Sequence, residues 1–212
     1  MKTALREVAQ QFPHLEFRMS ANQNVILANV GDIDRAPLNA LLASHGIKVD
    51  NQASILHAAA MACPALPTCG LALAESERIL PALLDRVEKL GGELGLGGEE
   101  IIIRTTGCPN GCARPYMAEI AFVGKAPGRY QLWIGGNASG TRLNRVFKDT
   151  VKEPDIETEL RPLLARWKAE RQPGERFGDF SARVIWPEVA AAAAEAAAAK
   201  AAAAPQPATV AS

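Results

Sequence analysis

The sequence predicts a mixed α+β (α/β) fold, in which mixed sheets are flanked by helices. Three observations support this class. Apolar residues recur at helical spacing in several segments, short β-branched runs lie between those segments, and turn residues such as Gly, Pro and Asn separate the two kinds. With 212 residues, of which 48% are hydrophobic and 22% charged, the chain can bury a substantial core.

Residues 1–50 are expected to form a compact unit of helices and strands. Helical spacing over 4–12 precedes two short strands within 14–30, which are joined by the polar turn "SANQN" at 20–24. The segment 32–46 has an Asp before its apolar run, a Pro in its first turn and a Gly at its end. These are typical start and stop signals of a helix.

A second unit is expected over residues 51–188. The prolines of "CPALPTC", 63–69, exclude a helix or an interior strand, so this segment must be a loop. The segment 71–92 has helical spacing, with Pro81 as a kink or as the start of a second helix. "EEIIIRTTG", 99–107, is a β-branched run suited to a buried strand.

The remainder of the second unit is predicted to be a hairpin followed by helices. Residues 117–136 alternate around "KAPGR", as a hairpin does. Helical spacing returns over 140–151 and 155–186. The Ala-rich segment from 189, within a tail of 189–212, favours helix but has almost no large side chain to bury, so a loose or frayed tail is expected.

The charge balance and hydropathy exclude several classes of partner. Lys plus Arg and Asp plus Glu both number 23, and no basic block or aromatic-interleaved basic run suggests a nucleic-acid surface. No apolar stretch reaches the roughly 18–20 residues that cross a bilayer, and the N-terminal sequence becomes polar too soon for a signal peptide. Nucleic-acid and membrane partners are therefore not expected, and a cytoplasmic location is the default.

Four cysteines form two close pairs, Cys63 with Cys69 and Cys108 with Cys112. In a reducing compartment such pairs indicate metal ligands or reactive thiols more than disulfides. Tetrathiolate zinc sites usually have gaps of two to four residues, which the five-residue gap of the first pair fits poorly, so an iron–sulfur cluster is favoured and zinc stays open. Ordinary buried cysteines are the remaining reading, although these lie in Pro- and Gly-containing loops.

Several longer motifs accompany the cysteines. The segments "CPALPTC", "TGCPNGC", "AEIAFVGKAPGRYQLWIGGN", "GTRL" and "GERFGDF" occur in this order. Over roughly residues 4–187 the chain resembles the C-terminal part of the siroheme-containing assimilatory sulfite and nitrite reductases, most closely the sulfite reductase hemoprotein (beta) subunits. Their pattern is Cys-x5-Cys, a long gap and Cys-x3-Cys.

The resemblance implies a role for each cysteine. Cys63, Cys69, Cys108 and Cys112 would ligate a [4Fe–4S] cluster, and Cys112 would also be the axial ligand that bridges to the siroheme iron, which makes it the catalytic residue. One shared sulfur shortens the electron path, so that the six electrons that reduce sulfite to sulfide pass singly. Pro109 permits the tight turn that such a shared thiolate needs.

Other polar residues have two readings each. By resemblance Asn110 would lie near the macrocycle, and Asn22, Gln23 and Asn24 could bind the siroheme carboxylates, although a polar hairpin turn has the same composition. Arg18 and Arg114 could pair with those carboxylates or be ordinary surface residues. The histidines are given no chemistry; they are His14, His45 and His57.

The chain departs from the resembled proteins in length, since these are roughly twice as long or more. The half that supplies most of the Arg and Lys residues for anionic substrate is not in this sequence, so the chain alone is expected to be a poor catalyst. A surface that faces the other half should expose apolar side chains or bind a partner. Expected partners are sulfite or nitrite, an NADPH-dependent flavoprotein or ferredoxin, and a chain supplying the missing half. A non-catalytic metal-binding scaffold is the alternative.

Overall fold

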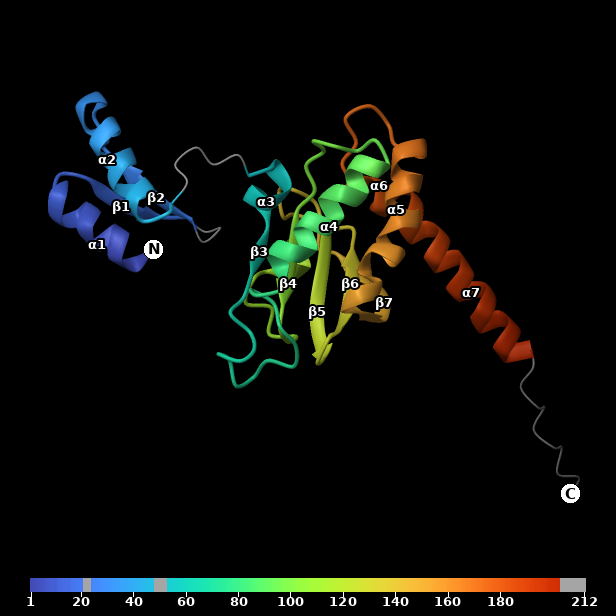
Figure 1. Ribbon diagram of the computed structural model, residues 1–212. Helices are drawn as coiled ribbons and strands as arrows, with labels where there is room; N and C mark the ends of the chain where they lie inside the picture. Colours follow the sequence, from blue (N-terminus) through green and yellow to red (C-terminus); the bar gives the residue numbers. More distant parts are fainter. Residues whose placement is uncertain (21–23, 48–52, 203–212) are drawn as a thin grey trace, which may run out of the picture.

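The structure is a computed structural model of the chain, and it describes residues 1–20, 24–47 and 53–202 (Figure 1). Side chains are described as far as residue 198. Two groups of elements follow each other along the chain. The first lies within residues 1–47 and the second within residues 53–202.

The first unit combines a two-stranded sheet with two helices. Its elements are α1 (Lys2–Gln11), β1 (Glu16–Met19), β2 (Val25–Ala28) and α2 (Asp32–Ser44). The strands are antiparallel, with Glu16 opposite Ala28 and Met19 opposite Val25. The helix, hairpin and helix expected over residues 4–46 are therefore all present.

The core of this unit comes from one face of each helix and from the start of the hairpin. Its buried apolar side chains are Val8, Phe12, Leu15, Leu38 and Leu42. Val8 and Phe12 are four residues apart, as are Leu38 and Leu42, so the two members of each pair point to the same side. Burying a side chain of this size contributes about 1.5–3 kcal/mol relative to leaving it exposed, so these contacts hold the helices on the hairpin.

The hairpin exposes apolar side chains as well as burying them. Phe17, Met19, Val25 and Ile26 all have large solvent-exposed fractions. A two-stranded sheet alone is marginally stable in water and offers two unpaired strand edges. Exposed apolar area is therefore present on β1 and β2.

The second unit is built on a five-stranded mixed sheet of order β3-β4-β5-β6-β7. The strands are β3 (Met61–Ala62), β4 (Ile103–Thr106), β5 (Ile120–Ala126), β6 (Arg129–Ile134) and β7 (Arg145–Lys152). β3, β4 and β5 are parallel neighbours, whereas β5, β6 and β7 are antiparallel neighbours. The buried strand and the hairpin expected from the sequence are β4 and the β5–β6 pair.

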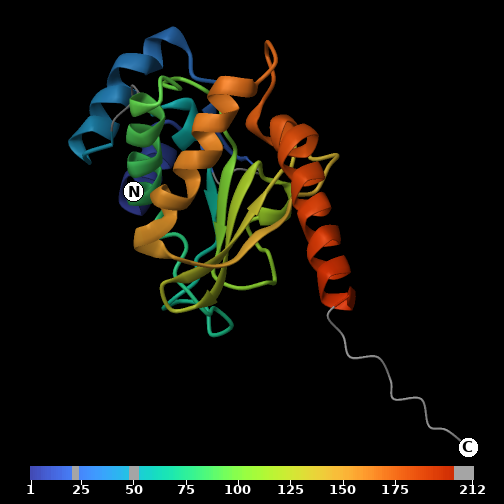
Figure 2. The same ribbon diagram turned by 90° about the vertical axis from the view of Figure 1, so that its right-hand side faces the viewer.

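Helices cover this sheet on both sides (Figure 2). They are α3 (Ile55–Ala59), α4 (Leu80–Glu93), α5 (Ile156–Glu170), α6 (Phe177–Phe180) and α7 (Trp186–Ala202), with short 3-10 turns at Pro115–Met117 and Glu153–Asp155 and a π-helical turn at Ser181–Ile185. In both views α4 and α5 lie side by side over one face, and α7 runs on the other side of the sheet.

One continuous core joins the sheet to its helices. Its largest fully buried side chains include Phe122 and Tyr130 of the central strands, Trp167 of α5, and Phe177 and Phe180 of α6. α4 contributes a buried face of leucines and valine at helical spacing. This core fixes the ends of β3 and β4, from which the cysteine loops extend.

Pro81 stands in the first turn of α4, where its missing N–H would have no partner inside the helix. The proline therefore marks a helix start and not a kink. Residues 71–79, which shared the helical spacing, form turns and bends before that start.

The prediction of a helix over residues 140–151 was wrong, because Arg145–Lys152 form the edge strand β7. Leu143, Phe147 and Val151 recur every four residues and imitate a helix. The unpaired side of β6 nevertheless accepts the segment as a strand, and Tyr130 lies opposite Val151. Tertiary pairing outweighs the local pattern here.

The helix that the Ala-rich composition favours is present as far as Ala202, in the continuous helix α7, and its side chains from Val189 to Ala198 are all exposed. The indole N–H of Trp186 donates to the Ile134 carbonyl oxygen at 3.3 Å, and Arg166 forms an ion pair with Glu188. These contacts fix the first turn, and the high helix propensity of Ala then carries the helix onward. The expected boundary between residues 188 and 189 falls inside this helix.

Candidate metal centre

Both cysteine loops leave the sheet at the same edge. Cys63 directly follows β3 and Cys108 follows β4 by two residues. The two strands are parallel, with Ala62 opposite Thr105, so their carboxyl ends lie next to each other. The topology therefore brings together two cysteine pairs that are far apart in sequence.

Gly107 joins the two loops. Its N–H donates to the Sγ of Cys63 at 3.2 Å, and its carbonyl oxygen accepts the N–H groups of Leu73 at 2.8 Å and Ala74 at 3.0 Å. A Cβ at this position would lie 2.6 Å from the Cβ of Ala65, so only glycine fits. The loop of the first pair is thus held directly against the residue that precedes the second pair.

Thr106 strengthens the same contact. Its hydroxyl lies 3.4 Å from the Sγ of Cys63 and donates to the Cys108 carbonyl oxygen at 3.3 Å. Inside the first loop, the N–H of Cys69 donates to the Ala65 carbonyl oxygen at 2.7 Å. Backbone and hydroxyl groups therefore fix three of the four cysteine positions.

The turn between Cys108 and Cys112 is tied down by Tyr116. The phenol donates to the Pro109 carbonyl oxygen at 2.6 Å, and burial, followed by the neighbouring Cys108, raises the pKa of Tyr116. Gly111 has φ +69°, and a Cβ there would lie 2.8 Å from the tyrosine ring. The turn is shaped so that Cys112 stands at the surface.

The four thiols differ in exposure. All are free: Cys63 and Cys108 are buried, Cys69 is partly exposed and Cys112 is exposed. Around one zinc ion, with Zn–S bonds of about 2.3 Å, thiolate sulfurs would be about 3.8 Å apart. Among the described residues, which include all four cysteines, no three of these sulfurs lie within 4.8 Å of one another.

Two arginines lie beside these loops. The guanidinium of Arg104, in β4, is buried and donates to the Arg114 carbonyl oxygen at 3.0 Å. Burial, and then the Arg114 cation, lower the pKa of Arg104. Arg114 itself has φ +53° and directs a guanidinium nitrogen to the Met61 sulfur at 3.7 Å. The loop after Cys112 is therefore held by a buried cation.

The remaining candidates from the sequence lie elsewhere. Asn22 and Gln23 are outside the described residues. The N–H of Asn24 donates to the Ser20 hydroxyl at 3.1 Å, as in a polar hairpin turn, and Arg18 pairs with Glu16 at 2.7 Å. Asn110 is exposed on the turn that carries Cys112.

Sequence reasoning missed Thr106, Gly107, Tyr116 and Arg104. A signal was present, because "RTTG" connects a buried strand to the first cysteine of the second pair. A polar run at the carboxyl end of a parallel strand is a common place for site residues. The contact from Tyr116 back to Pro109 depends on the turn geometry and had no sequence signal.

No helix in the described part of the chain is long and apolar enough to cross a membrane. Residues 1–45 match the nitrite/sulfite reductase ferredoxin-like half domain. Among solved structures, Mycobacterium tuberculosis NirA protein matches with a TM-score of 0.69 and 22% identity, over 86% of this chain and 36% of that one. The fold of this chain is therefore similar to that of part of the NirA protein.

The sequence comparisons are more specific. The sulfite reductase [NADPH] hemoprotein beta-component of Staphylococcus carnosus is 49% identical over 183 residues, which are 86% of this chain and 32% of that protein. The sulfite reductase [ferredoxin] of Synechococcus elongatus is 50% identical over 184 residues, 87% of this chain and 29% of that protein. The chain is a homologue of the sulfite reductase hemoproteins, and it spans about a third of their length.

Proposed function

We propose that this chain is the part of an assimilatory sulfite reductase that ligates a [4Fe–4S] cluster and siroheme. The observation that carries the proposal is the contact at Gly107, which holds the loop of Cys63 and Cys69 against the loop of Cys108 and Cys112. The identity of about 50% to sulfite reductases supports the same assignment.

The donor set fits a cluster. Two loops that contact each other at Gly107 carry four free thiols, and thiolates are the usual ligands of iron–sulfur clusters. When bound, the cluster supplies one-electron transfer. The buried Cys63 and Cys108 keep water from one side, while backbone N–H groups such as that of Gly107 donate to the sulfur and stabilise its thiolate form.

Cys112 is proposed as the thiolate that also faces the siroheme. It is the exposed member of the set, so a second group can reach its sulfur from outside. Asn110 and Arg114 lie on the same turn or next to it, and we assign them to the rim of the macrocycle. A guanidinium can hold a carboxylate by two hydrogen bonds.

Sulfite is the proposed substrate, because the similar proteins are named sulfite reductases. Reduction to sulfide takes up six electrons and six protons per hydrogen sulfite ion and releases three waters. The names of those proteins also identify NADPH and ferredoxin as electron sources, and we propose one of them here, in the cytoplasm. Nitrite is the alternative that the matched half domain admits.

The rest of the binding site is proposed to come from sequence outside this chain. The similar proteins are about three times as long, and the β1–β2 hairpin exposes Phe17, Met19, Val25 and Ile26. An apolar two-stranded sheet with open edges suits a second sheet of the same kind. Cationic side chains for the sulfite oxygens would then be supplied by that partner.

Anaerobic reconstitution with iron and sulfide, with and without siroheme, tests this function. Iron and acid-labile sulfide should bind in equal amounts and be lost in Cys63→Ser, with Thr68→Ser, an exposed neighbour of Cys69, as the control. Cys112→Ser should in addition abolish the spectral coupling between siroheme and cluster. Uptake of one zinc per chain and no sulfide would overturn the proposal in favour of a structural zinc module.

A further inference from the structure

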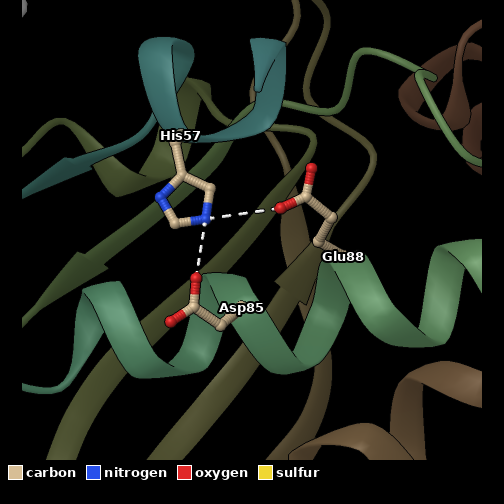
Figure 3. A group of neighbouring side chains, drawn as sticks. All are labelled: His57, Asp85 and Glu88. Atoms are coloured by element: carbon tan, nitrogen blue, oxygen red, sulfur yellow. Dashed lines mark ion pairs between the residues drawn. The ribbon is translucent and has the colours of Figure 1, made fainter. Parts of the chain in front are cut away.

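A second group of possible metal ligands lies on α3 and α4, away from the cysteines. The imidazole of His57 points from α3 to α4, between the carboxylates of Asp85 and Glu88 (Figure 3). Its Nε2 is 3.3 Å from Asp85 Oδ1 and 3.7 Å from Glu88 Oε2. One ligand atom from each residue lies within 4.8 Å of the others.

These distances differ from those of the other histidine–carboxylate pairs. His14 lies 2.8 Å from Asp34 and His45 lies 2.9 Å from Glu7, which are ordinary hydrogen-bond lengths. His57 lies farther from each of two carboxylates. Two ligands bound at about 2.1 Å to one ion, at a tetrahedral angle, would be about 3.4 Å apart. The spacing around His57 is therefore that of ligands around an ion.

The charges around the group also favour a cation. Asp85 and Glu88 are three residues apart, so they share one face of α4, where like charges repel. In the part of the chain that the structure describes, neither carboxylate forms an ion pair with Lys or Arg, and Arg86 between them pairs with Glu153 instead. Neutral His57 would leave both negative charges uncompensated. A divalent ion would offset both.

The two helices hold the ligands in place. At the start of α3 the side-chain oxygen of Ser54 accepts a hydrogen bond from the backbone N–H of His57, and Leu56 is buried in the core. On α4, the buried Leu83 and Leu90 fix the face opposite to the carboxylates. The ligand-bearing faces can thus meet without a large rearrangement.

The site is open on one side. His57 is 25% exposed, whereas Asp85 is 73% and Glu88 48% exposed. His57 also lines a cavity of about 430 Å³ that Met61 and Glu77 border. Three protein ligands with water in the other positions is the arrangement of an exchangeable or catalytic metal and not of a closed structural one.

We propose that His57, Asp85 and Glu88 bind one divalent first-row transition-metal ion at the surface of α3 and α4, as a site separate from the cysteine centre. One imidazole nitrogen and two carboxylates suit ions such as Mn²⁺, Fe²⁺ or Zn²⁺. The cysteine thiolates prefer softer partners, so Mn²⁺ distinguishes the two sites. The proposal does not depend on the proposed reductase function.

The test is a titration of the full chain with Mn²⁺, in which the free ion is followed by its electron paramagnetic resonance signal. The wild-type chain should remove about one equivalent. His57→Gln, Asp85→Asn and Glu88→Gln should each weaken binding at least tenfold, since even the loss of an outer hydrogen-bond partner of a metal ligand costs about 10- to 100-fold. Circular dichroism should show that each variant keeps the fold, because these side chains are outside the core.

His45→Gln is the matched control, because among the described residues His45 has one carboxylate partner, Glu7, and belongs to no group of three possible ligands. It should leave Mn²⁺ binding unchanged. Absence of stoichiometric uptake by the wild-type chain would overturn the proposal and leave an ion pair only. Equal uptake by His57→Gln, or an equal loss in His45→Gln, would overturn it as well.

Discussion

Gly107 and Gly124 lie backbone against backbone at the edge where the cysteine loops begin. A Cβ on Gly124, in β5, would collide with the carbonyl oxygen of Gly107, and a Cβ on Gly107 would lie 2.7 Å from the Ala74 carbonyl oxygen. Two glycines therefore allow the first cysteine loop to pack on both β4 and β5. The positions of the cysteine loops depend on this close approach.

Gly107→Ala should destabilise the fold by about 1–3 kcal/mol, because the added methyl group overpacks a site closed by backbone atoms. It should also reduce iron binding, since the loop of Cys63 must move. Urea unfolding and iron analysis measure the two effects. Gly97→Ala is the control, as a Cβ at Gly97 meets nothing within 4 Å. Wild-type stability and iron content in Gly107→Ala would contradict this account of the loops.

The exposure of the thiols predicts their order of alkylation in the metal-free chain. Cys112 should react first with iodoacetamide and Cys69 next, while the buried Cys63 and Cys108 should react only when the chain opens. Mass spectrometry of timed, quenched samples measures the order, and a sample in denaturant should label all four thiols at similar rates. Labelling of Cys63 as fast as Cys112 in the folded chain would be incompatible with this packing.

The sequence predicted those parts of the fold in which local and tertiary preferences agree. The helix spacing near Val8 and the alternation around Tyr130 both have a buried face that tertiary structure uses. β7 was missed because most of its side chains are exposed, so the alternation is weak while Phe147 and Val151 have helical spacing. The Ala-rich part of α7 could be expected from helix propensity, whereas the contact of Trp186 with Ile134 that anchors its start could not be read from that segment.

The candidate site divides in the same way. The cysteine pairs could be found because each pair is local and its Pro- and Gly-containing loops exclude regular structure. The group of His57 with Asp85 and Glu88 could not, because its histidine lies on another helix and only the packing of α3 on α4 brings it near. Buried Arg104 likewise depends on the path of the loop at Arg114.

Glu119 should be the carboxylate whose loss destabilises the second unit most. It is fully buried and accepts hydrogen bonds from Arg176 at 2.7 Å, from the Gly178 N–H at 3.1 Å and from the Ile102 N–H at 2.9 Å. The hydrogen bond that Arg176 donates to Glu119 is also the main cause that raises the pKa of Arg176.

Glu119→Gln should therefore cost about 3–5 kcal/mol in the free energy of unfolding, because it removes the buried charge that pairs with Arg176 and places an NH2 group against a backbone N–H that now donates to Glu119. Glu100, a half-exposed partner of the same Arg176, provides the matched control, and Glu100→Gln should cost less than about 1 kcal/mol. Chemical denaturation followed by circular dichroism measures both. Similar losses in the two variants would show that burial at Glu119 is not the deciding factor.

Tyr130 should make stability depend on pH in the alkaline range. Its hydroxyl donates to the Glu75 carbonyl oxygen at 2.8 Å, and burial, followed by the charges of Glu75 and Glu153, raises the pKa of Tyr130. A raised pKa in the folded state means that the fold binds the proton more tightly than the unfolded chain does. The contribution is thus complete below the unfolded pKa of about 10 and declines as the pH rises above it toward the folded value.

Tyr130→Phe separates this effect from the titration of lysines, which both proteins share. At neutral pH the variant should be about 1 kcal/mol less stable, because it lacks the hydrogen bond to the Glu75 carbonyl oxygen, or slightly less destabilised if Phe packs well. Above pH of about 10 the difference in stability between wild type and variant should shrink. The unfolded wild-type chain then releases its phenol proton while the folded chain still keeps it, which favours unfolding of the wild type only. Urea unfolding at a series of pH values measures the difference. A gap that stays constant or widens with pH would mean that the phenol ionises at least as readily in the fold as in the unfolded chain.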